Sequence, residues 1–174
     1  MAIFICHASS DNAIATKVYD RLAKYHSIPC YIDDIDKELS KRRGKSELTS
    51  YLVDKLKKCD TLFAVVTQNT KQSWWVPFEI GTARQLPIII TSYTNLPEPS
   101  QMDYPIALPE YLLEWPRLRT DKEVDIFAQK YISQGTSQER PFLFSESRFS
   151  SSDLGNPRDF ELSMMRALNQ RTFI

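Results

Sequence analysis

The residues best suited to chemistry lie in one stretch, Ser73 to Arg84, which reads SWWVPFEIGTAR. A single acid, Glu79, stands there among apolar and aromatic neighbours, although a carboxylate prefers water and an indole does not. If a helix begins near Ser73, Pro77 falls in or just after its first turn, where the missing N–H costs little. Trp75 and Glu79 are four residues apart and would share one face, where an indole and a partly desolvated acid can hold a flat ligand and its charge. Spacing alone equally fits tryptophans that fill a core beside a solvated Glu79.

The composition is that of one domain without a strong charge. The chain has 174 residues, and its 22 basic and 22 acidic residues give a formal net charge of zero. This balance favours neither a nucleic acid nor an anionic membrane as a partner. The three cysteines show no CxxC spacing, so we expect free thiols in a reducing compartment. The N-terminus lacks the basic start and the long apolar run of a signal peptide or membrane span, and we therefore predict a cytoplasmic protein.

Strand patterns alternate with helix patterns along the chain. Short apolar runs predict strands at residues 2–6, 28–32, 61–67, 87–91 and 111–115. Helical periodicity predicts helices that begin after a cap at Asp11, near Ser46, near Ser73, and after a capping box formed by Thr120 and Glu123. This alternation predicts an α/β fold in which helices flank a five-stranded parallel sheet.

The C-terminal part departs from this alternation. After Gly135 the sequence becomes rich in serine, and Asn156 and Pro157 are suited to cap and to begin a last helix. We therefore predict a domain over residues 1–133 and an extension over residues 134–174, whose helix packs on the domain or on a partner subunit.

Polar residues follow the predicted strands at one edge of the sheet. Ligands on open parallel sheets bind beyond the carboxyl ends of the strands. That edge would hold His7 and Ser9 after the first strand, Asp33 in a charged loop after the second, and Glu79 beyond the third. His7 alone fits a hydrogen-bonded structural histidine, and Asp33 alone fits a loop cap or a solvated acid. Their convergence with Glu79 indicates a site.

Common catalytic and cofactor motifs do not fit this sequence. Residues 43–46 end like a phosphate-binding loop, but Leu39 stands where the first glycine of that motif belongs. No GxGxxG follows a predicted strand. A hydrolase triad of Ser9, His7 and Asp33 would lack the GxSxG elbow. The cysteines and histidines near the first two strands lack the paired spacing of zinc ligands, so we expect no metal.

Two stretches, IFICHASSD at residues 3–11 and WVPFE at residues 75–79, resemble a TIR (Toll/interleukin-1 receptor-like) domain of the stand-alone bacterial kind. The acidic loop between them, which ends in a glycine, adds to this resemblance. It covers about residues 1–133, and the WxxxE element is its most specific part. The family fold is a flavodoxin-like sheet of five parallel strands, in agreement with the alternation above. The loop over residues 33–44 is longer and more basic than in many members, and the serine-rich tail lies outside the family pattern.

The resemblance implies an enzyme that cleaves the bond between nicotinamide and ribose in NAD. Nicotinamide leaves as a neutral molecule, so no general acid is needed. Glu79 matches the family's catalytic glutamate, which would hold the ribose hydroxyls and stabilise the oxocarbenium-like charge. Trp75 matches the motif tryptophan and would wall the site, whereas Trp74 is expected to be its packing neighbour. The expected substrate-binding residues are Trp75, His7, Ser9 and Asp33.

The leading hypothesis is an NAD glycohydrolase or ADP-ribosyl cyclase similar to the TIR enzyme of Thoeris anti-phage defence. NAD would be its substrate rather than a cofactor, and a cyclic ADP-ribose-type product, or ADP-ribose, would reach a separate effector protein. Self-association through TIR surfaces is also expected. Two alternatives remain open: a catalytically silent TIR interaction module, and a nucleoside deoxyribosyltransferase-like enzyme.

Overall fold

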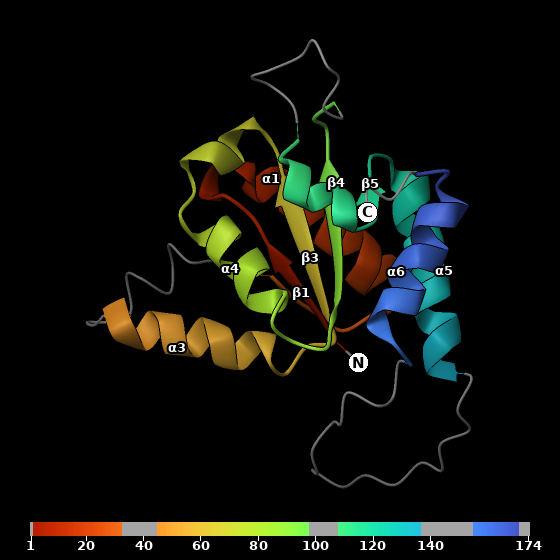
Figure 1. The fold of residues 1–174 in the computed structure, drawn as a ribbon, viewed down its shortest axis with the longest axis horizontal. Coiled ribbons are helices and arrows are strands. Elements are labelled where there is room, and N and C mark those ends of the chain that lie inside the picture. Colours follow the sequence, from red (N-terminus) through yellow and green to blue (C-terminus); the bar gives the residue numbers. More distant parts are fainter. Residues whose placement is uncertain (1, 33–44, 98–107, 137–154, 171–174) are drawn as a thin grey trace, which may run out of the picture.

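Five parallel strands form one sheet at the centre of the molecule. The computed structural model describes residues 2–32, 45–97, 108–136 and 155–170. The strands lie in the order β2-β1-β3-β4-β5, and every neighbouring pair is parallel (Figure 1). Their bounds are β1 (Ile3–Cys6), β2 (Cys30–Ile32), β3 (Thr61–Val66), β4 (Ile89–Thr94) and β5 (Arg117–Leu118). The predicted α/β fold with a five-stranded parallel sheet is confirmed.

Helices cover both faces of this sheet (Figure 1). One face carries α1 (Asn12–Tyr19) with its π-helical continuation η2 (Asp20–Tyr25), α5 (Asp121–Thr136) and α6 (Pro157–Ala167). The other face carries α3 (Lys45–Leu56), α4 (Trp75–Ala83) and the 3₁₀ helix η4 (Glu110–Glu114). Two further 3₁₀ turns, η1 (Ser9–Asp11) and η3 (Gln68–Gln72), follow β1 and β3. Since strand side chains alternate between faces, Ile3 and Ile5 pack under α1, whereas Phe4 and Cys6 pack under α3 and α4.

The fifth strand lies later in the chain than predicted. The apolar run at residues 111–115, predicted as a strand, belongs mostly to η4, and β5 begins only at Arg117. Pro109 precedes this helix and accepts a hydrogen bond from the Leu112 backbone N–H at 3.0 Å, which closes a tight turn. Leu112 and Leu113 of η4 are buried against the sheet. A short apolar run cannot by its pattern be told from a buried turn of helix, and this prediction was therefore wrong.

Prolines also explain why two strands begin later than predicted. Pro29 precedes β2 and Pro87 precedes β4 by two residues, and a proline has no N–H with which to join a ladder inside a sheet. The capping box before α5, in contrast, is confirmed. The Thr120 backbone N–H donates to Glu123 Oε2 at 3.0 Å, and the Glu123 backbone N–H donates to Thr120 Oγ1 at 3.2 Å.

Helix α6 packs against the sheet of its own chain. Asn156 caps it by accepting a hydrogen bond from the Arg158 backbone N–H at 3.0 Å, and Pro157 is its first residue. Phe160 is buried, and its ring meets that of Phe127 edge to face at 5.6 Å between centroids. The apolar side of α6 thus completes the core beneath α5. The boundary between a domain and an extension at residue 133 stays a prediction.

The residues of α6 and its end also close the edge of the sheet. The Ile90 backbone N–H points to the side where β5 would pair, and it donates instead to Glu161 Oε1 at 2.9 Å. The Gln170 side chain pairs with Arg117 on β5, accepting from its backbone N–H at 3.0 Å and donating to its backbone oxygen. Two side chains therefore satisfy backbone groups that an open sheet edge would leave unpaired.

Cys6, Cys30 and Cys59 form no disulfide, as the spacing of the cysteines predicted. Burial raises the pKa of both Cys30 and Cys59 to about 12, so these two thiols stay protonated near neutral pH. No helix in the described ranges is both long and apolar enough to cross a bilayer.

Candidate active site

The order of the strands marks one place on the sheet as the expected ligand site. The chain passes from β1 to β2 on one side and then to β3 on the other side of β1. At such a reversal the connections diverge, and ligands bind beyond the carboxyl ends of the two strands. The segments that leave those ends are residues 7–11 after β1 and residues 67–79 after β3. The polar stretches singled out in the sequence therefore meet at this reversal.

Glu79 lies in the second turn of α4 and is buried. The helix begins at Trp75 rather than at Ser73, whose hydroxyl oxygen accepts a hydrogen bond from the Val76 backbone N–H at 3.3 Å. Pro77 is the third helical residue, where a missing N–H is tolerated, as predicted. The Glu79 side chain is only 2% exposed. The simpler interpretation of this residue, a solvated acid at a helix start, is therefore wrong.

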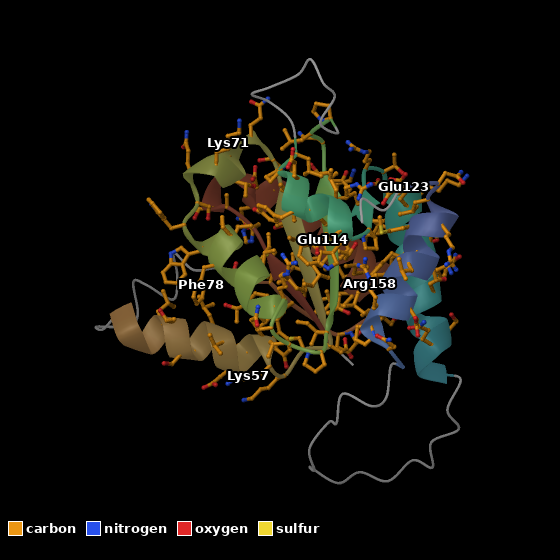
Figure 2. The ribbon with its side chains drawn as sticks, in the orientation of Figure 1. Lys57, Lys71, Phe78, Glu114, Glu123 and Arg158 are labelled. Atoms are coloured by element: carbon orange, nitrogen blue, oxygen red, sulfur yellow. The ribbon has the colours of Figure 1, made fainter. Side chains whose placement is uncertain are left out.

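The two adjacent tryptophans have opposite environments. Trp75 is half-buried against the core, and its ring meets that of Phe78 edge to face at 6.0 Å between centroids. Phe78 lies on the side of α4 that faces α3 (Figure 2). Trp74 is 91% exposed, so the expectation that it packs beside Trp75 is wrong. It precedes the helix as its N-cap residue, where its side chain projects away from the core.

The other three predicted substrate-binding residues are His7, Ser9 and Asp33, and the structure treats each of them differently. His7 follows β1 directly and is buried at the same edge of the sheet as the segment after β3. Ser9 begins η1 and is exposed, so the structure does not bury it with His7 and Glu79. Asp33 lies outside the described residues. Among the residues that the structure describes, no group of three or more histidine, cysteine, aspartate or glutamate side chains is placed to hold a metal ion.

Asp11 has a role that the sequence did not indicate. It stands at the N-cap position of α1, as predicted, but its side chain makes no capping hydrogen bond. Instead Thr67 Oγ1 donates to Asp11 Oδ2 at 2.7 Å, and Asn69 Nδ2 donates to Asp11 Oδ1 at 2.7 Å. These partners are more than fifty residues away along the chain, so no local spacing reveals them.

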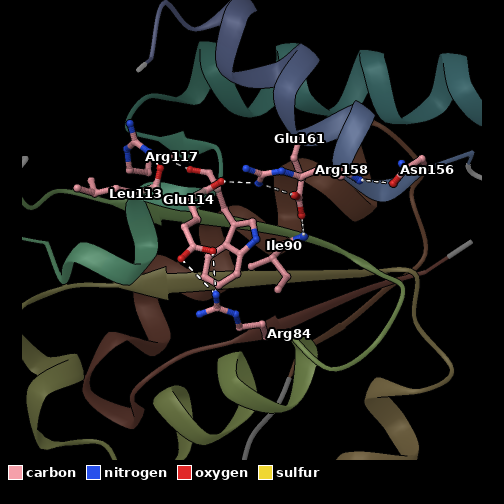
Figure 3. Close-up of polar contacts among 9 residues, drawn as sticks. Arg84, Ile90, Leu113, Glu114, Arg117, Asn156, Arg158 and Glu161 are labelled. Carbon is pink, nitrogen blue, oxygen red and sulfur yellow. Dashed lines mark hydrogen bonds and ion pairs between the residues drawn. The ribbon is translucent and has the colours of Figure 1, made fainter. Parts of the chain in front are cut away.

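Helix η4 is held between α4 and α6 by a polar network (Figure 3). Arg84, at the end of α4, places its Nη2 atom 3.3 Å from Oε1 and 3.2 Å from Oε2 of Glu114. Arg158 of α6 donates through Nη1 to the Glu114 backbone oxygen at 2.8 Å and to Glu161 Oε2 at 3.2 Å. The network links the end of the helix that carries Glu79 to the C-terminal helix.

Tyr111 lies on η4, although the sequence pattern had predicted a strand there. Tyr111 is 40% exposed, and its pKa is raised first by burial and then by the nearby Cys6 thiol.

Fold and site together define an α/β protein of the flavodoxin-like strand order, with a buried carboxylate on the helix after β3. The profile of the TIR domain matches residues 3–129, which is most of the chain. The chain therefore belongs to the TIR-domain family, whose members include NAD-cleaving enzymes and scaffolds and commonly self-associate. A comparison with curated proteins finds none that matches the chain.

Proposed function

We propose that this TIR domain cleaves the bond between nicotinamide and ribose in NAD. The observation that carries the proposal is the burial of Glu79, 2% exposed, on the helix that leaves β3 at the strand-order reversal. Burying a carboxylate costs free energy, and folds retain such groups chiefly where function needs them. Trp75 lies one turn earlier on the same helix, where its indole can border a flat ring.

The proposed chemistry needs one carboxylate. The C1′–N bond of NAD breaks, and its electron pair goes to the pyridinium nitrogen, so nicotinamide leaves without a proton donor. Glu79 holds the ribose hydroxyls and stabilises the positive charge that develops at C1′, an interaction that is stronger in a site that excludes water. Water then attacks C1′ to give ADP-ribose, with loss of a proton. Alternatively, a nucleophile within the same molecule attacks C1′ and loses a proton, which gives a cyclic ADP-ribose.

The more specific part of the proposal concerns the biological role of this reaction. The resemblance of IFICHASSD and WVPFE to stand-alone bacterial TIR domains supports a cytoplasmic anti-phage enzyme of the Thoeris kind. Its product would be a cyclic ADP-ribose-type signal for a separate effector protein. Mass spectrometry of the product, followed by addition of that product to a candidate effector protein, tests this part separately from bond cleavage.

Incubation of the purified chain with NAD tests the reaction itself. Nicotinamide should appear in an amount equal to the NAD consumed, together with ADP-ribose or a cyclic product that is lighter than ADP-ribose by one water. The assay is repeated in extracts of phage-infected cells, since a defence enzyme can require a trigger. Absence of nicotinamide release under both conditions would overturn the proposal.

A second candidate function, a TIR interaction module without catalysis, is favoured by one observation. Trp74 is 91% exposed, and exposed aromatic residues are typical anchors of protein interfaces. This candidate predicts no NAD cleavage but loss of self-association in a Trp74→Ala variant, measured by analytical ultracentrifugation. No observation favours the nucleoside deoxyribosyltransferase-like alternative.

A further inference from the structure

A polar cluster joins the two segments that carry the candidate site. Asp11 comes from the segment after β1, and Thr67 and Asn69 come from the segment after β3. Each oxygen of the Asp11 carboxylate accepts one hydrogen bond, from Thr67 Oγ1 and from Asn69 Nδ2, both at 2.7 Å. Asp11 is 2% exposed and Thr67 is 5% exposed. The bond from Thr67 is buried, whereas Asn69 is exposed and its bond to Asp11 is only partly buried.

Further hydrogen bonds continue from this cluster to the first turn of α4. The Asn69 backbone N–H donates to Thr67 Oγ1 at 3.0 Å, and the Thr67 backbone N–H donates to Thr70 Oγ1 at 2.9 Å. The Ser73 backbone N–H then donates to the Thr70 backbone oxygen at 3.0 Å. Finally, the Val76 backbone N–H donates to Ser73 Oγ at 3.3 Å. The start of α4 is therefore tied to Asp11 through η3.

Asp11 is also hydrogen-bonded within the segment that follows β1. The Asp11 backbone N–H donates to the Ala8 backbone oxygen at 2.7 Å, which closes a tight turn directly after His7. Asp11 thus contacts both segments, one through its backbone and the other through its side chain. Its side chain does not cap α1, so helix capping does not account for it.

We propose that Asp11 is a positioning residue for the reaction. It holds the segment that carries His7 in a fixed position relative to Trp75 and Glu79 across the strand-order reversal. The inference rests on the proposed function for the reaction that it serves. Asp11 acts through the two segments that it joins. A displacement of about 1 Å in a group that holds a substrate can cost on the order of 100-fold in rate, so a loosened junction has a measurable effect.

An exchange of charge between the two partners tests this role. Asn69→Asp replaces the amide that donates to Asp11 with a carboxylate, so this hydrogen bond is lost and Asp11 faces a group of like charge. The double variant D11N/N69D restores an amide facing a carboxylate, with the positions reversed. Asn12→Asp is the matched control, because it adds the same charge next to Asp11 on an exposed residue of α1.

The expected kinetic result is a loss followed by a rescue. N69D should lower kcat/KM for NAD by on the order of 100-fold, mainly through kcat, because Glu79 acts on the transition state. D11N/N69D should return it to within roughly tenfold of the wild type, and N12D should leave it unchanged. An N69D protein that folds and keeps full kcat/KM would overturn the inference, and so would a double variant without rescue.

A readout without substrate separates this inference from the proposed function. The indole N–H resonance of Trp75 and the exchange rate of the Val76 amide report the start of α4 directly. Both should change in N69D and return in D11N/N69D, even if the wild-type protein cleaves no NAD, in which case only the proposed function fails. Unchanged signals in a folded N69D protein would overturn the positioning role. If N69D does not fold, N69A removes the same hydrogen bond without adding charge, and the same signals decide.

Discussion

Glu161 on α6 accepts a hydrogen bond from the backbone N–H of Ile90 on β4, and it does so where β4 extends beyond the short strand β5. A side chain from the last helix thus takes the place of a backbone partner in the sheet. Burial raises the pKa of Glu161, which shows that its surroundings disfavour the charged form. The bond therefore ties α6 to the sheet through a group that is costly to bury.

This contact predicts a difference between two substitutions of Glu161. Glu161→Leu should lower the free energy of unfolding by about 1–3 kcal/mol, because it leaves the buried Ile90 N–H without an acceptor. Glu161→Gln keeps an acceptor oxygen and removes the buried charge, so its effect should stay below about 1 kcal/mol. Urea unfolding of both variants measures the difference. Equal stability of E161L and the wild type would show that α6 adds nothing at this edge.

Replacement of the buried acid tests its proposed role. Glu79→Gln keeps the size of the side chain and removes its charge, so it should lower kcat/KM for NAD by roughly 100- to 1,000-fold. Asp54→Asn is the control, because it makes the same change of charge on an exposed residue of α3. Both are measured by nicotinamide release. A folded E79Q protein with full turnover would remove the assigned role.

The two tryptophans should respond differently to truncation. Trp74→Ala should change the free energy of unfolding by less than about 0.5 kcal/mol, because this side chain is 91% exposed. Trp75→Ala should destabilise the protein, since this ring packs on the core, and it should also slow NAD cleavage. Trp75→Phe keeps an aromatic face and should retain more turnover than Trp75→Ala. The prediction for Trp75 fails if both substitutions leave turnover intact.

A charged cluster lies on the face of the sheet opposite to α4 and is formed by Arg21, His26 and Asp125. This cluster predicts that the stability of the fold depends on pH. Arg21 donates to Asp125 through Nε at 2.7 Å and through Nη2 at 2.5 Å, and His26 Nε2 lies 2.8 Å from Asp125 Oδ1. The hydrogen bond from Arg21 is the main reason that the pKa of Asp125 falls from 3.8 to about 2. Because the folded-state pKa is the lower one, the stabilisation is present above the ordinary pKa and is lost as the pH falls through about 2.

Asp125→Asn should therefore lower the free energy of unfolding at neutral pH, and its difference from the wild type should shrink between about pH 4 and pH 2. Chemical unfolding at a series of pH values measures this difference, with Asp54→Asn as the exposed control. A difference that is constant over this range would show that the pair with Arg21 does not stabilise the fold.

The fold was largely predictable, because its elements are defined by local patterns. The run TLFAVVT at residues 61–67 is apolar and β-branched at its end, and it forms β3 almost as predicted. The fifth strand was not predictable in the same way. Residues 111–115 are equally apolar, but Pro109 and the packing of η4 on the sheet make them a turn of helix. Apolar runs of this length acquire their conformation from what they pack against.

The candidate site, like the fold, was predictable only in the features that depend on neighbouring residues. The sequence by itself determined the caps of α5 and α6, the alternation of strands and helices, and the stretch that carries Trp75 and Glu79, because these features depend on residues within a few positions of one another. Only the tertiary structure decided that Glu79 is buried, that Trp74 is exposed while Trp75 packs, and that Asp11 binds Thr67 rather than capping its own helix. Burial and long-range hydrogen bonds depend on which distant segments meet, and no local spacing contains that information.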